Sequence, residues 1–94
     1  MMDFSIKRND GQPFSLHSEK RGDVFKPAGS SEIGGGYYSV KTPNGDIHVN
    51  PDGAGFRIHF ENYTGSTEEA EALVHSMASR LHGATGEAGE VIRH

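Results

Sequence analysis

Three side chains that can do chemistry, Arg57, His59 and Glu61, stand at alternate positions past the middle of the chain, with His48 upstream. Histidine titrates near neutral pH and binds metals, and arginine binds anions. Two histidines and a carboxylate can hold zinc or ferrous iron. The spacing His-x10-His-x-Glu matches no specific metal motif, however. The sequence therefore predicts neither a metal site nor a cofactor.

Two turn signals place these residues on a sheet. Asn44-Gly45 is a strong signal for a tight hairpin, and Asp52-Gly53 is a second one. Turns centred there predict a three-stranded meander that pairs Thr42 with Ile47 and Val40 with Val49. The same turns pair Val49 with Phe56 and Ile47 with Ile58. In both hairpins the apolar residues share one face, and this agreement supports the meander.

The other face of this meander is predicted to be polar. In these registers Lys41, His48 and Arg57 form one row, and His59 lies near Asp46. One face of a small antiparallel sheet is polar whenever it faces water, and that is the simpler explanation. We nevertheless take this face as the candidate binding surface, with no catalytic residue assigned. Its members are Tyr37, Ser39, Lys41, His48, Asn50, Arg57, His59 and Glu61.

The N-terminus is expected to form a separate hairpin. Residues 2–8 alternate between apolar and polar side chains, with the period of a half-buried strand. A three-residue loop over Asn9-Asp10-Gly11 would set Ile6 opposite Phe14 and Phe4 opposite Leu16. Only that register keeps the apolar residues together.

An amphipathic helix is predicted between Ser66 and Gly83. Ser66 and Glu69 have the spacing of a capping box, and glycine is favoured just after a helix ends. Acidic residues gather at the start of this segment, where the helix dipole favours them. One continuous apolar stripe would cover the apolar face of the sheet. Its members are Ala70, Leu73, Val74, Met77 and Leu81.

The expected fold class is therefore α+β, a small antiparallel sheet packed on one C-terminal amphipathic helix. We expect a single domain over residues 1–83. Residues 18–36 are rich in glycine and serine and are expected to form a mobile connection within it. Residues 84–94 alternate small and acidic side chains and are expected to form a flexible C-terminal tail.

Composition excludes several classes of protein. The 94 residues suit one domain, and the formal charge of −4 disfavours binding to nucleic acid through phosphates. No cysteine is present, so the chain has no disulfide, no thiolate metal site and no cysteine nucleophile. No apolar run has the length of a signal peptide or a membrane helix. A cytoplasmic location without membrane contact is the expectation.

By elimination, we expect a non-catalytic protein-binding module whose partner is another protein or a second copy of the chain. Size and composition alone suggest a small inhibitor or regulator of the kind that phages and mobile elements direct against host assemblies. One alternative is a metal- or anion-dependent enzyme that uses His48, His59, Arg57 and Glu61. Another is a binder of single-stranded nucleic acid, in which Lys41 and Arg57 contact phosphates and Tyr37 stacks on bases.

Overall fold

The computed structural model describes residues 2–94, which form two layers: one β-sheet, and helices packed on one of its faces. Strand β1 opens the chain, a 3-10 helix η1 and a short helix α1 follow, and four strands run in succession before the long helix α2 and the last strand. The bounds are β1 Met2–Arg8, η1 Ser18–Lys20, α1 Arg21–Phe25, β2 Ser31–Ile33, β3 Tyr38–Thr42, β4 Gly45–Asp52, β5 Gly55–Glu61, α2 Thr67–Thr85 and β6 Gly89–Arg93. The α+β class and the C-terminal helix on an antiparallel sheet are confirmed.

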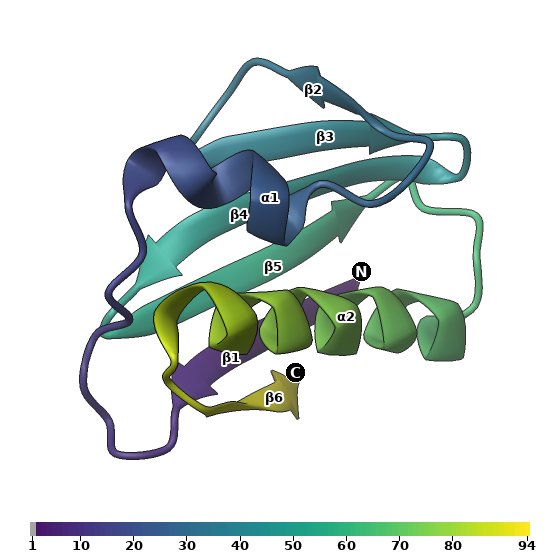
Figure 1. Cartoon of the computed structure of the whole chain (residues 1–94). Coiled ribbons are helices and arrows are strands. Elements are labelled where there is room, and N and C mark those ends of the chain that lie inside the picture. Colours follow the sequence, from purple (N-terminus) through teal and green to yellow (C-terminus); the bar gives the residue numbers. More distant parts are fainter. Residues whose placement is uncertain (1) are drawn as a thin grey trace.

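All six strands join one antiparallel sheet in the order β2-β3-β4-β5-β1-β6. The first strand of the chain therefore lies between β5 and the last strand, β6. Among the described elements, α1 and α2 both cover the same face of the sheet (Figure 1). The opposite face, which no described element covers, is called the uncovered face below.

The core fills the space between the sheet and the two helices. The strands contribute alternate apolar residues, α2 contributes its apolar stripe, and α1 contributes Val24 and Phe25. Burial of each large side chain stabilises the fold by about 1.5–3 kcal/mol before entropy is counted. The buried apolar residues are Phe4, Ile6, Val24, Phe25, Val40, Ile47, Val49, Phe56, Ile58, Phe60, Ala70, Val74, Met77 and Leu81.

The meander is present, but both of its predicted registers are wrong by two residues. Val40 pairs with Ile47 because Pro43 and Asn44 occupy the turn, and Gly45 already pairs with Thr42. Proline suits the turn since its φ is fixed. Gly45 has φ +140°, and a Cβ there would lie 2.7 Å from the Asn62 carbonyl oxygen.

The second turn shows the same displacement, because Asp52 pairs with Gly55 and Val49 pairs with Ile58. The side-chain period of a strand is two, so a displacement by two keeps every residue on its predicted face. The predicted inner and outer faces of these strands are therefore confirmed, although the pairs across them differ.

The predicted N-terminal hairpin is wrong. The Asn9–Gly11 turn forms, with a hydrogen bond from the Gly11 amide to the Arg8 carbonyl. The chain then leaves the sheet, and β1 pairs with β5 and β6 instead. Phe14 lies in irregular structure and stacks on Phe56, so its apolar surface is satisfied without a strand.

Two segments expected to be irregular contain regular structure. The segment 18–36 holds η1, α1 and β2, and Arg80 of α2 donates to the Val24 carbonyl at the end of α1. The expected tail holds β6, paired with β1 from Gly89 to Arg93. Helix α2 passes through Gly83 and ends at Gly86, whose φ of 74° is left-handed.

Candidate functional site

The predicted binding residues lie on the uncovered face, with one exception. Direct pairing across β3, β4, β5 and β1 defines which side chains share this face, because opposite residues of an antiparallel pair point the same way. The face contains seven of the predicted residues together with Asp3, Ser5 and Asp46 from the same sheet. Its members are Asp3, Ser5, Ser39, Lys41, Asp46, His48, Asn50, Arg57, His59 and Glu61.

One row of directly paired residues crosses the centre of the uncovered face. Ser39 pairs with His48, His48 with His59, and His59 with Asp3. Ser39 Oγ lies 2.8 Å from His48 Nδ1, and His59 Nδ1 lies 3.1 Å from Asp3 Oδ1. The two imidazole rings stack, with centroids 6.3 Å apart. We call these four residues the histidine row; it replaces the predicted row of Lys41, His48 and Arg57.

Charged side chains flank the histidine row, Glu61 on one side and Arg57 on the other. His48 Nε2 lies 3.1 Å from Glu61 Oε2, so both ring nitrogens of His48 contact a polar partner. Arg57 Nε lies 3.4 Å from Asp3 Oδ1, and its guanidinium also approaches Asp52 at 4.0 Å. The row is thus held by contacts between residues of four neighbouring strands, β3, β4, β5 and β1. A surface built in this way presents its polar groups in fixed positions.

Two serines lie at the floor of this face. Ser39 is 2% exposed and donates to the Gly35 carbonyl at 2.7 Å. Ser5 is fully buried, and its hydroxyl lies 2.7 Å from Nε2 of the C-terminal His94. Small hydroxyl side chains let the larger imidazoles lie over them. The described residues leave no buried side-chain polar atom without a hydrogen bond.

The contacts from Ser39 through His48 to Glu61 resemble the order of nucleophile, base and acid in a hydrolase. Attack on a substrate requires an accessible serine oxygen. Ser39 is buried, however, and its hydroxyl is already bonded to the Gly35 carbonyl. These positions fit a structural contact rather than a poised nucleophile.

The geometry also disfavours the metal site considered above. The rings of His48 and His59 are inclined by only 24° to one another, so their nitrogens do not converge on a common point. In residues 2–94, no group of three or more histidine, aspartate or glutamate side chains is arranged to hold a metal ion. His48 and His59 instead contact Glu61 and Asp3 individually.

Tyr37 lies off the uncovered face, which corrects its predicted place. It precedes β3, and its ring packs 5.7 Å from that of Phe56 in the core. The guanidinium of Arg21 lies over the ring of Tyr37, 4.7 Å from its centroid. This position separates Tyr37 from Lys41 and Arg57, so the three residues do not form the surface that binding to single strands would need.

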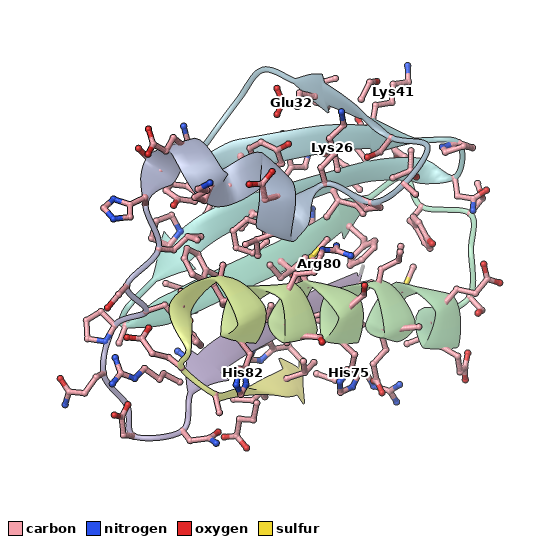
Figure 2. All side chains as sticks on the ribbon, viewed as in Figure 1. Lys26, Glu32, Lys41, His75, Arg80 and His82 are labelled. Carbon is pink, nitrogen blue, oxygen red and sulfur yellow. The ribbon has the colours of Figure 1, made fainter. Side chains whose placement is uncertain are left out.

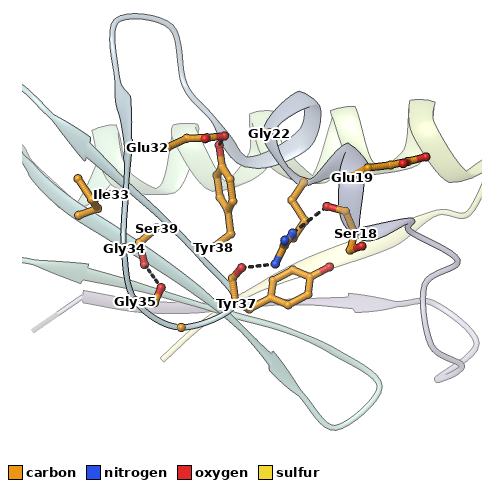
Figure 3. Close-up of a pocket in the computed structure, with 12 residues that line it drawn as sticks. Ser18, Glu19, Gly22, Glu32, Ile33, Gly34, Gly35, Tyr37, Tyr38 and Ser39 are labelled. Atoms are coloured by element: carbon orange, nitrogen blue, oxygen red, sulfur yellow. Dashed lines mark hydrogen bonds between the residues drawn. The ribbon is translucent and has the colours of Figure 1, made fainter.

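A cavity of about 460 Å3 lies between α1 and the hairpin of β2 and β3 (Figure 3). Arg21 donates from this site to the carbonyls of Ser18 and Tyr37, so its charge is held in place. Tyr38 donates to Glu32 at 2.7 Å, and partial burial together with this carboxylate raises the pKa of Tyr38. The cavity is polar, and its Arg21 and Glu32 side chains already have hydrogen-bond partners within the chain.

Sequence reasoning missed Asp3 and Ser5. The alternation in residues 2–8 did place both on the polar side of a strand. The incorrect hairpin then paired that strand with residues 14–16 and not with β5. The pattern of alternation identifies the face of a residue but not the neighbouring strand, so the contact between Asp3 and His59 was not predictable.

Comparison of the chain with protein-family models, curated proteins and solved structures gives no match in any of the three. No helix in the described part of the chain is long and apolar enough to cross a membrane. The geometry of the uncovered face is therefore the main indication of function.

Proposed function

We propose that this chain is a non-catalytic binding module, which holds a protein partner against the uncovered face of its sheet. The observation that carries the proposal is the histidine row with Glu61 and Arg57 beside it. Strands position these side chains, and their mutual contacts keep them in place before a partner arrives. Such preorganisation lowers the entropy lost on binding.

The extent and charge of the face fit a protein better than a phosphate backbone. Six strands about 4.8 Å apart span on the order of 25 Å. This width is close to the side of a square patch of about 800 Å2, the area that each partner buries in a standard interface. Lys41 and Arg57 are interspersed with Asp46, Asp52 and Glu61. Mixed charges of this kind select a partner with the complementary pattern.

We also propose a regulatory role and a cellular location for the protein. A small domain that covers part of a larger protein can act as an inhibitor or regulator, and we propose this role for the chain. The absence of cysteine is compatible with a reducing compartment, and we propose the cytoplasm as its location.

Two matched pairs of histidines allow a direct test. The double variant His48→Ala/His59→Ala removes the row, whereas His75→Ala/His82→Ala removes two exposed histidines from α2. Each tagged variant is immobilised and incubated with a lysate of the cells from which the protein comes, and the proteins that remain bound are identified. We expect the wild type and the α2 variant to retain the same partner and the row variant to lose it.

Urea denaturation shows whether the row variant remains folded. Retention of the partner by a folded row variant would contradict the proposal, and so would failure of the wild type to retain any protein above a tag-only control.

A further inference from the structure

The two edges of the sheet differ in how open they are. At one edge, β2 is only three residues long and is followed by Gly34-Gly35-Gly36, and shortness protects an edge from pairing with another chain. At the other edge, β6 has five residues, Gly89-Glu90-Val91-Ile92-Arg93, without a proline. In the described chain, β1 is the one strand that pairs with it.

Hydrogen bonds at both ends of β6 fix the direction of its backbone groups. The His94 amide donates to the Asp3 carbonyl, and the Asn9 amide donates to the Ala88 carbonyl. Direction alternates along an antiparallel strand, so Glu90 and Ile92 also face β1. Gly89, Val91 and Arg93 therefore direct their amides and carbonyls away from the sheet, toward the open edge.

We infer that this edge pairs with β6 of a second copy of the chain, which forms a two-fold dimer with a continuous sheet. In antiparallel pairing, the outward groups of Gly89, Val91 and Arg93 must meet the outward groups of the copy. Only the register with Val91 on the two-fold axis uses all three residues in both copies. Val91 then faces Val91, and Gly89 faces Arg93 of the second copy.

The side chains suit that register. Val91 is half-buried and already packs on the core, so the copy's valine would extend the apolar contact. Glu90 would face Ile92 of the second copy, and this avoids the like-charge pair that a displaced register would create by setting Glu90 against Glu90. Arg93 remains beside Glu71 of α2, 3.6 Å away on the covered side of the sheet.

Helix α2 adds to the contact. It lies over β1 and the edge strand β6 (Figure 1), and Figure 2 shows His75 and His82 on its β6 side. A two-fold axis at Val91 would bring α2 and its copy together in antiparallel orientation. The N-terminal half of one helix would then lie nearer the C-terminal half of the other, an arrangement in which the two helix dipoles attract each other.

This surface is separate from the one proposed for the partner. Pairing at β6 would leave both histidine rows uncovered on the same side of a twelve-stranded sheet. The dimer and the partner interaction can therefore fail independently of each other.

Sedimentation equilibrium of the full chain over a wide concentration range tests the dimer. We expect the wild type to approach twice the 10.2 kDa chain mass. Val91→Pro removes an outward amide from each copy, so it should raise the dissociation constant about tenfold or more, since each lost hydrogen bond contributes about 1 kcal/mol. Ile92→Pro is the matched control, because its amide faces β1 and its loss should lower the urea midpoint of the fold.

A cysteine cross-link tests the register even where a proline variant unfolds. The chain has no cysteine. Two Cα atoms of a hydrogen-bonded antiparallel pair lie about 5.5 Å apart, within the roughly 4.4–6.8 Å that a disulfide spans. Val91→Cys should therefore form a covalent dimer in a glutathione redox buffer, at a more reducing ratio than Ile33→Cys on β2. A monomeric wild type at all concentrations, or equal cross-linking at both edges, would overturn the inference.

Discussion

The two faces of the sheet are made from alternate residues of the same strands, yet they are held in different ways. On the covered face, apolar side chains such as Ile58 and Phe60 pack beneath α1 and α2. They stabilise the fold by filling the core without cavities. On the uncovered face, the histidine row depends on specific contacts between polar groups. The comparison indicates that one strand can serve stability with one set of residues and recognition with the other.

The largest expected effect is on the covered face. Ile58 is fully buried and pairs with Phe4 and Val49 on the neighbouring strands. Ile58→Ala leaves a cavity and should lower the free energy of unfolding by about 2–5 kcal/mol. The adjacent His59→Ala, on the other face of β5, should cost below about 1 kcal/mol, because its contact with Asp3 is partly exposed. Urea denaturation measures both, and similar losses would remove the distinction between the faces.

Ser39 tests whether the floor of the uncovered face behaves like a core. Ser39→Ala leaves the Gly35 carbonyl and His48 Nδ1 without their partner, so it should lower the free energy of unfolding by about 1–3 kcal/mol. Lys41→Ala, at the next outward position of β3, is exposed and should change it by less than about 0.5 kcal/mol. Chemical denaturation should show a larger loss of stability for Ser39→Ala than for Lys41→Ala. An unchanged stability of Ser39→Ala would mean that the histidine row does not depend on the buried hydroxyl beneath it.

The covering helix contributes a smaller, local effect. Ser66 Oγ accepts from the Glu69 amide at 3.1 Å, which caps the first turn of α2. Ser66→Ala should lower the free energy of unfolding by about 1 kcal/mol, and amide exchange should accelerate in that turn. Ser79→Ala, at an exposed site within the same helix, provides the control. Unchanged exchange at the start of α2 would show that packing alone holds the helix on the sheet.

The smallest expected effect on stability concerns Glu87, which precedes β6 and belongs to neither face of the sheet. Glu87 accepts hydrogen bonds from the backbone amide and hydroxyl of Ser15 and pairs with Arg8, and these contacts lower the pKa of Glu87. Because the folded chain favours the ionised carboxyl, its contribution is complete above the ordinary pKa of 4.5 and is lost as pH falls through the lower folded value.

Glu87→Gln should therefore show a shallower loss of stability below pH 4.5 than the wild type, measured by urea denaturation at a series of pH values. Glu68→Gln, at an exposed position of α2, controls for the removal of one negative charge. Parallel pH curves for Glu87→Gln and the wild type would contradict the lowered pKa of Glu87 in the folded chain.

Local patterns in the sequence predicted which side of a strand or helix each residue occupies. Alternation placed His48 and Arg57 on the outer face, and the spacing of Val74, Met77 and Leu81 placed these residues in the core. The capping box at Ser66 also formed as expected. These features depend on neighbours within a few residues, which the sequence shows directly.

Pairing between distant segments was not predictable in the same way. The contact between β1 and β6 joins residues about ninety positions apart, as Ser5 and His94 illustrate. The apolar content of β6 is confined to Val91 and Ile92, so its short pattern resembled a tail. The turns at Pro43-Asn44 and Gly53-Ala54 were displaced because several glycine- and proline-rich registers preserve the same faces, and only the contacts beyond the hairpin distinguish them.

The position of β1 between β5 and β6 has a consequence for synthesis of the chain. β1 must remain without a partner strand until β5 has been synthesised, and its second neighbour, β6, follows only after α2. Contacts of such long sequence separation close slowly. A nascent chain that has not yet reached Gly89 would therefore expose the edge of β1 that β6 covers in the finished sheet.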